Sequence, residues 1–189
     1  MTVRGVIPNG ILALAIFLAG AGIGQFVQES RAAGSSAAAA REALVASAAR
    51  TLGVRRCLPA IAAIGNRAVA GATLQDIMLD WDRQAPDAAP FFSFTGLGAG
   101  TQRAALTLSA IPVVSGGCAV LVERVSGTAK SCTAVAASEL PGFPGTRLIE
   151  NIMVYQNPAQ PGETYALIDN SGGCIVIRRQ TTFKWPPRP

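Results

Sequence analysis

A long apolar run near the N-terminus, residues 11–27, constrains this chain more than any other feature of its sequence. The run is broken only by Gln25, and no second run of this kind follows. A chain with one such segment has one segment directed to a membrane. The polar, cysteine-bearing remainder is therefore expected across that membrane or released beyond it.

Two interpretations of the segment stay open. A spanning helix needs about 20 apolar residues, and residues 6–28 are long enough to form a transmembrane or assembly helix. A cleaved signal peptide also fits, with Arg4 as its charged start and Ala19-Gly20-Ala21 as its small-residue cleavage site. The residues alone do not choose between an anchor and a cleaved signal.

The alanine-rich stretch that follows predicts an amphipathic helix, because alanine has the highest helix propensity. We assign this helix to residues 35–53, where Gly53 is a natural stop. No proline lies between it and segment 6–28. The two segments are therefore expected to form one continuous rod, on the order of 60 Å long at the helical rise.

Two further helices are predicted before residue 90. Residues 58–70 form the first, with Pro59 in its first turn. The second starts with the capping arrangement of residues 73–76 and is ended by Pro86 and Pro90. Within it, Leu74, Ile77, Met78 and Trp81 form an i, i+3, i+4, i+7 stripe of the kind that faces a core.

Beyond Pro90 the pattern changes to short alternating runs, which predict an antiparallel sheet of four or five strands. Residues 118–125 fit a strand and a helix equally well, and residues 139–145 are expected to form a loop. The strand candidates are residues 91–95, 104–111, 149–155, 164–168 and 174–178, with 181–185 continuing the last.

All four cysteines follow the apolar run. An even number of cysteines in an exported chain predicts two disulfides in an oxidising compartment. Their spacings match no zinc pattern, so no metal site is expected. Three pairings are open on the residues alone. The cysteines are Cys57, Cys118, Cys132 and Cys174.

The chain contains no histidine, and we predict that it is not an enzyme and binds no cofactor. Without histidine the usual general base and the usual metal ligand are missing. Ser126, Lys130 and Ser131 are close in sequence, but we interpret them as a solvated turn. Asp76 and Asp80 are interpreted as a solvated face.

The glycine-rich stretch at residues 96–100 lacks the lysine of a phosphate-binding loop, and we predict that it is a flexible turn. The net charge is +5, but the basic residues are scattered and do not alternate with aromatic residues. No nucleic-acid partner is therefore predicted.

The layout resembles that of type IVb pilins, particularly the thin-pilus pilins of conjugation systems. Residues 105–112 followed by Cys118-Ala119-Val120-Leu121 look like that family's strand, proline and helix start. Ser171-Gly172-Gly173-Cys174, followed by residues 181–183, looks like its last cysteine and closing strand. The resemblance implies an α+β fold, with a long N-terminal helix packed on an antiparallel β-sheet head at residues 54–189.

The resemblance also implies particular bonds and processing. It predicts a Cys118–Cys174 disulfide, which leaves Cys57–Cys132 as the second, and it favours a helix over residues 118–125. Gly5, preceded by Arg4 and followed by Val6, looks like a prepilin peptidase site, with residues 1–5 as the leader. The family's glutamate at the fifth mature position is replaced by Gly10, which favours a minor subunit.

The function implied is a structural subunit of an extracellular filament or of a secretion or conjugation apparatus. Its partners would be copies of itself or other pilins, joined through the N-terminal helix, and the membrane. The protein would cross the inner membrane once before assembly, with its head in the periplasm or in the fibre. A membrane-anchored periplasmic accessory protein of an envelope complex and a secreted binding module are the alternatives, and the ligand of the head stays open.

Overall fold

The computed structural model describes residues 42–186, and these residues form one antiparallel sheet with three short helices. The elements in chain order are α1 (Leu44–Thr51), α2 (Leu58–Ala68), β1 (Leu74–Trp81), β2 (Phe91–Ala99), β3 (Gln102–Pro112), β4 (Cys118–Thr128), α3 (Cys132–Glu139), β5 (Gly145–Ile149), β6 (Ile152–Gln156), β7 (Glu163–Asn170) and β8 (Gly173–Trp185).

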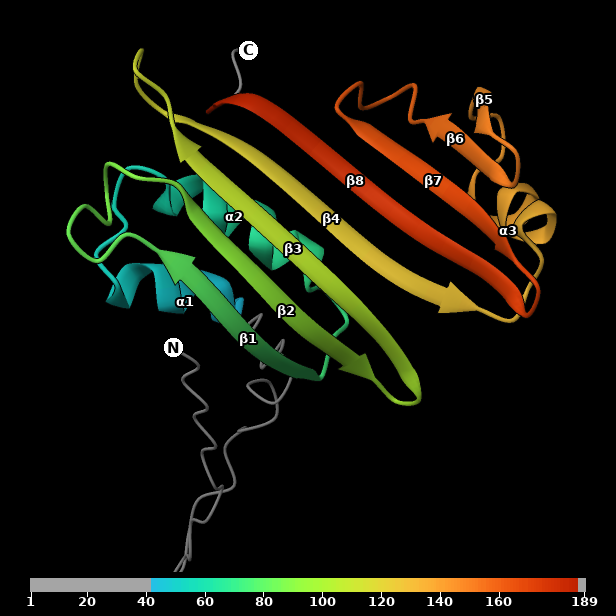
Figure 1. The fold of residues 1–189 in the computed structure, drawn as a ribbon, viewed down its shortest axis with the longest axis horizontal. Helices are drawn as coiled ribbons and strands as arrows, with labels where there is room; N and C mark the ends of the chain where they lie inside the picture. Colours follow the sequence, from blue (N-terminus) through green and yellow to red (C-terminus); the bar gives the residue numbers. More distant parts are fainter. Residues whose placement is uncertain (1–41, 187–189) are drawn as a thin grey trace, which may run out of the picture. The chain divides into compact units, whose positions relative to one another are not determined.

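The sheet consists of two four-stranded meanders joined along their longest strands. The strand order is β1-β2-β3-β4-β8-β7-β6-β5, and every neighbouring pair is antiparallel (Figure 1). We call β1–β4 the N-terminal meander and β5–β8 the C-terminal meander. α3 connects them, and the seam between them is the long β4–β8 ladder.

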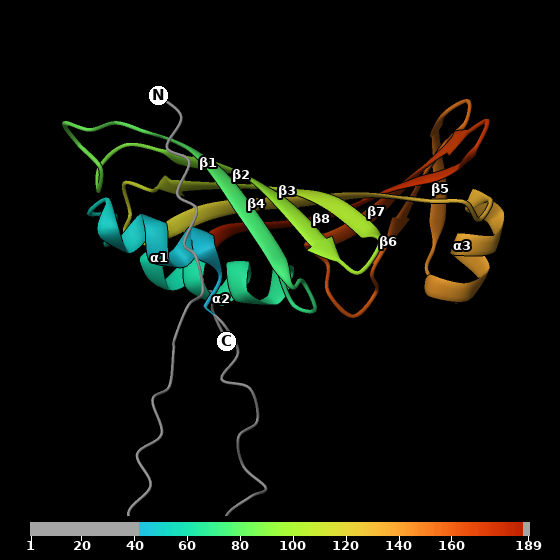
Figure 2. The ribbon, with the colours of Figure 1, turned by 90° about the horizontal axis from the view of Figure 1, so that it is seen from below.

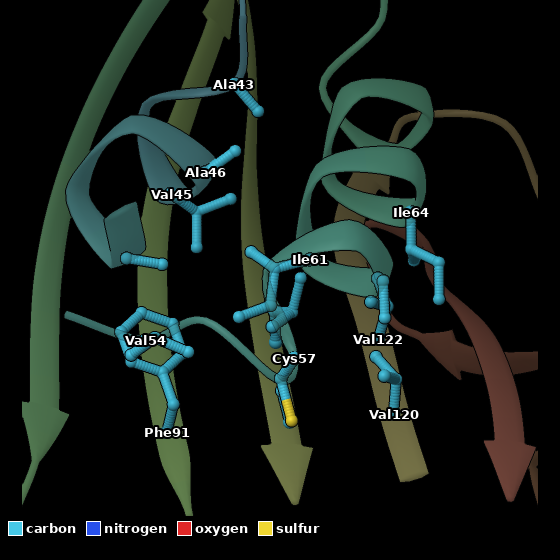
Figure 3. Close-up of a cluster of buried hydrophobic side chains, with 14 of the residues drawn as sticks. Ala43, Val45, Ala46, Val54, Cys57, Ile61, Ile64, Phe91, Val120 and Val122 are labelled. Carbon is cyan, nitrogen blue, oxygen red and sulfur yellow. The ribbon is translucent and has the colours of Figure 1, made fainter. Parts of the chain in front are cut away.

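One face of the N-terminal meander is covered by α1 and α2 (Figure 2). Antiparallel partners point their side chains to the same side, so the inward residues of β2, β3 and β4 form a common floor for the two helices. Phe91, Leu106, Leu108 and Val120 belong to this floor and are buried. Val45 and Ala46 from α1 and Ile61 and Ile64 from α2 pack against it (Figure 3).

The C-terminal meander has a much smaller core, beneath α3. Its buried members are Val135, Leu140, Leu167 and Cys174. Phe143 and Tyr165 pack at the margin with their rings edge to face, 5.9 Å apart. α3 lies on the same side of the sheet as α1 and α2. Cys174, which lies beneath α3, opposes Thr128 of β4, and Thr128 is an even number of residues from Val122, so the side chains of Cys174 and Val122 point to the same face.

The prediction of a pilin-like fold with a long N-terminal helix is wrong. α1 has only eight residues, and Ala43 immediately before it has an extended backbone (φ −55°, ψ 132°). The Ala43 amide donates to Asn66 Oδ1 of α2 rather than to a preceding helical turn, so helix 35–53 does not run through this point. The predicted leader at residues 1–5 and the predicted apolar helix at residues 6–28 lie outside the described residues. Within residues 42–186, none of the helices has the length and apolar content needed to cross a membrane.

Two further helix predictions are also wrong. Residues 74–81 form β1, which is paired with β2 along its whole length. The helical stripe was a coincidence, because Gln75, Ile77, Leu79 and Trp81 also alternate and point inward. Residues 118–125, for which the pilin resemblance favoured a helix, form the first part of β4, which is paired on both sides. The predicted helix at residues 58–70 is confirmed as α2.

The sheet has more strands than predicted because several sequence signals were merged or missed. The predicted strand 149–155 covers the last residue of β5, a tight turn in which Asn151 adopts a positive φ of 63°, and most of β6. The stretch at residues 96–100 is not a flexible turn, since residues 96–99 complete β2. α3 was not predicted. Its last residue, Glu139, is the first residue of the region 139–145 that was expected to form a loop.

The prediction that all four cysteines form disulfides is confirmed, but the pairing implied by the pilin resemblance is wrong. The bonds are Cys57–Cys118 and Cys132–Cys174. β4 and β8 are antiparallel, and Cys118 opposes Trp185 while Cys174 opposes Thr128. Cys118 and Cys174 therefore lie at opposite ends of the ladder, about 33 Å apart along the strand, and no bond can join them.

Candidate functional site

The side of the sheet that faces away from all three helices is a broad apolar surface, which we call the open face. It is formed by the alternate residues of each strand whose side chains point away from the core. Its large exposed side chains are Leu74, Met78, Phe92, Phe94, Ile111, Val125 and Phe183.

The open face follows from the strand register. Phe94 of β2 opposes Met78 of β1, and both side chains are about half exposed, at 46% and 56%. One register row crosses five strands as Ala105, Val125, Ile177, Ala166 and Val154 without a polar residue. Half-exposed aromatic and aliphatic side chains gathered into one patch are unusual on a monomeric surface and are typical of an interaction site.

Charges on the open face are few and arranged at its margins or in pairs. Glu123 and Arg179 oppose each other on β4 and β8 and form an ion pair of 3.2 Å. Asp76 and Asp80 lie on β1, an edge strand, where charged residues discourage strand addition by another chain. The middle of the face is therefore electrically neutral.

The opposite face carries a buried charged cluster around Glu163, at the start of β7. The Glu163 carboxylate is 2% exposed. It accepts hydrogen bonds from Asn157 Nδ2 at 2.5 Å, Tyr165 Oη at 3.2 Å and Arg178 Nε at 2.5 Å. The guanidinium carbon of Arg178 also lies over the Tyr165 ring, 5.8 Å from the ring centroid. These contacts tie the β6–β7 loop to β7 and β8.

The cluster shifts the pKa of its members. Burial opposes ionisation of Glu163, but hydrogen bonds from Asn157, Arg178 and Tyr165 and the charge of Arg178 outweigh burial and hold its pKa below the ordinary value. Burial raises the pKa of Tyr165. An ionised carboxylate with three donors is a structural clamp rather than a proton-transfer group.

The structure places Ser126, Lys130 and Ser131 in different elements, although Ser126 and Lys130 line one cavity. Ser131 Oγ caps α3 by accepting from the Ala134 amide at 3.2 Å, so this hydroxyl has a structural role. Ser126 lies in β4, and Lys130 is an exposed residue of the turn before α3. Asp76 and Asp80 are exposed on β1, and the Asp76 carboxylate accepts from the Ile77 amide.

No metal centre forms among residues 42–186, where no three potential ligands of the cysteine, aspartate and glutamate types gather. The predictions that the chain is not an enzyme and needs no cofactor stay predictions. Sequence reasoning missed both the open face and the Glu163 cluster. Alternation at Phe92 and Phe94 was a signal for the former, whereas no local pattern marks Glu163.

The chain matches no protein-family model, no curated protein and no solved structure. The resemblance to type IVb pilins therefore stays a prediction.

Proposed function

We propose that the protein is a non-enzymatic structural subunit of a cell-envelope assembly, and that its disulfide-bonded head joins a second copy of the chain through the open face. The observation that supports this proposal is the apolar, neutral surface on the side of the sheet opposite to α1, α2 and α3. The apolar segment at residues 11–27 and the two disulfides support an envelope location. The proposal does not include the long helix of a pilin.

The size of the open face suits a stable protein contact. With about 4.8 Å between strands and about 3.3 Å per residue, the sheet presents a face on the order of 1,000 Å². A standard interface takes about 800 Å² from each partner. Two such faces can pack as a sandwich, about 10 Å apart, with the strands of both sheets roughly aligned.

A second copy is the occupant that the chemistry favours. An apolar, neutral surface is complementary to itself, and a two-fold axis brings the same patch of each subunit together. A strongly charged partner would find little to pair with, because the Glu123–Arg179 pair already neutralises the centre. Phe92 and Phe94 would be the central aromatic contacts, the residue type that contributes most to interfaces.

Photocrosslinking of the oxidised full-length chain tests the proposal. A benzoylphenylalanine probe in place of Phe94 should give an adduct of two copies, with crosslinked peptides from β1–β4 or β8. The same probe at Val114, a fully exposed loop position away from the sheet faces, should give none.

Substitutions on the open face sharpen the test. Met78→Asp, which places a charge opposite the Phe94 probe, should reduce the adduct at least tenfold, while Val114→Asp should leave it unchanged. An adduct with another protein, or equal adducts from Phe94 and Val114, would refute self-association through this face.

A further inference from the structure

A small cavity on the helix-bearing side of the sheet is surrounded by three arginines from three different elements. Arg67 comes from the last turn of α2, Arg124 from β4 and Arg178 from β8, and the cavity has a volume of about 120 Å³. Gln160 and Gln180 add amide groups to the lining. The cavity lies on the side of the sheet opposite to the open face.

The sheet register brings two of these arginines together. Arg124 and Arg178 are direct cross-strand partners in the β4–β8 ladder. Like charges directly opposite each other destabilise a sheet. At the adjacent register position, Glu123 and Arg179 form an oppositely charged pair, so the like-charged pair is specific to the cavity side.

Within the part of the chain that the structure describes, one of the three arginines has its charge compensated. Arg178 pairs with Glu163 at 2.5 Å, and the carboxylate is already occupied by further donors. The side chains of Arg67 and Arg124 form no ion pair or hydrogen bond with any residue from 42 to 186. Arg67 at a helix C-terminus is favoured by the helix dipole, but Arg124 in the middle of a strand has no such explanation.

We propose that this cavity binds a phosphomonoester group. Three guanidinium charges and one carboxylate leave about two positive charges uncompensated, and a phosphomonoester carries about −1.5 to −2 at pH 7. A carboxylate ligand would leave one of these charges unpaired. Guanidinium groups also bind phosphate oxygens in bidentate fashion, and the exposed side chain of Arg67 leaves the cavity accessible.

Calorimetric titration of the oxidised full-length chain with inorganic phosphate at low ionic strength tests the proposal. Saturable binding is expected, and Arg124→Gln should weaken it at least tenfold. Arg147→Gln is the matched control, because it removes the same charge from an exposed position on β5. Absence of saturable binding in the millimolar range, equal binding by Arg124→Gln, or equally tight binding of acetate would overturn the proposal.

Thermal unfolding gives a readout that a merely misfolded variant would not reproduce. Without phosphate, Arg124→Gln should unfold at the same temperature as the wild type or above it, because a repulsive pair is removed. With saturating phosphate the wild type should become the more stable protein, since a ligand that binds only the folded state stabilises it. A variant that is less stable under both conditions would contradict the repulsion on which the site rests.

The phosphomonoester could be carried by a small molecule or by a lipid headgroup, and vesicles separate these sources. Phosphatidylcholine vesicles with and without phosphatidic acid are compared for binding to the wild type and to Arg124→Gln. A loss of phosphatidic acid-specific binding in Arg124→Gln supports a lipid source, whereas phosphate binding without it supports a soluble one. Because Arg124 and Phe94 lie on opposite faces, failure of this proposal leaves self-association untouched, and the reverse also holds.

Discussion

The two meanders have the same architecture but are stabilised by different means. Each is a four-stranded antiparallel unit with helical structure on the same side of the sheet. The N-terminal meander buries a continuous set of aliphatic and aromatic side chains under α1 and α2. The C-terminal meander buries four hydrophobic residues, one of which is the disulfide-bonded Cys174, together with the charged Glu163.

The difference shows how a small sheet unit can be held without a large core. Where apolar burial is limited, a disulfide and a hydrogen-bonded ion pair take its place: Cys132–Cys174 fixes α3 to the start of β8, and Glu163–Arg178 fixes β7 to β8. In the N-terminal meander, Cys57–Cys118 adds a covalent bond to a core that is already extensive. The C-terminal meander is therefore expected to be the region that opens first.

Leucine-to-alanine substitutions at two positions, one in each core, give the largest expected effects and test the comparison directly. Leu108→Ala, in the rigid N-terminal core, should lower the free energy of unfolding by about 3–5 kcal/mol, because the surrounding side chains cannot fill the cavity. Leu167→Ala, in the small C-terminal core, should cost about 2–3 kcal/mol because that site can collapse more easily. Urea denaturation of the oxidised proteins measures both.

Leu148 on β5 is the matched control, since it is 68% exposed. Leu148→Ala should change the free energy of unfolding by no more than about 0.5 kcal/mol. Equal losses at Leu108 and Leu167 would mean that the two cores are equally rigid, and the comparison would be wrong in that respect.

The two disulfides should differ in the region that opens after their removal. Each closes a long loop, across separations of 61 and 42 residues, so each double cysteine-to-alanine variant should lose about 2–4 kcal/mol. Without Cys132–Cys174, amide hydrogen exchange should accelerate first in α3, because few buried side chains hold it. Without Cys57–Cys118, the amides of β2 and β3 should still exchange only through unfolding of the whole molecule.

Native-state hydrogen exchange of the two double variants, compared with the wild type, measures this difference. If α3 amides in the Cys132→Ala/Cys174→Ala variant stay as protected as those of β3, the C-terminal meander does not depend on its disulfide as we infer.

The sequence predicted those elements whose signals are local. α2 was predicted because Pro59 lies in its first turn and Gly71 follows its end. The central strand β3 was predicted from the alternation of Leu106 and Leu108 with Thr107 and Ser109. These residues carry the signal themselves, whatever the rest of the chain does.

The elements that were wrong are those decided by distant partners. In β1, Ile77 and Trp81 belong both to a helical stripe and to an alternating one, and only pairing with Phe91–Ala99 settles the choice. The disulfide pairing depends on which ends of β4 and β8 meet. The open face was not predicted for a related reason. Phe91 points inward while Phe92 and Phe94 point outward, and the aromatic composition of this strand does not show which of its faces is buried.

The Glu163 cluster gives the smallest expected effect and connects the comparison to pH. Glu163→Gln replaces the carboxylate with an amide that cannot accept from Asn157 and Arg178 in the same way, and should lower the free energy of unfolding at pH 7 by about 1–3 kcal/mol. The folded-state pKa of Glu163 lies below its unfolded value. Its contribution is therefore fully present above the unfolded pKa, near 4.3, and is lost as the pH falls through the folded pKa.

Urea denaturation between pH 7 and pH 3 checks this prediction. The stability difference between the wild type and Glu163→Gln should be constant from pH 7 to about pH 5 and should shrink below that, as the wild-type carboxyl takes up its proton. Glu150→Gln, an exposed position in the β5–β6 turn, removes the same charge and should leave stability within about 0.5 kcal/mol of the wild type. A difference for Glu163→Gln that stays unchanged down to pH 3 would show that the ionised carboxylate is not what holds β7 to β8, and the C-terminal meander would then depend on its disulfide and four buried residues alone.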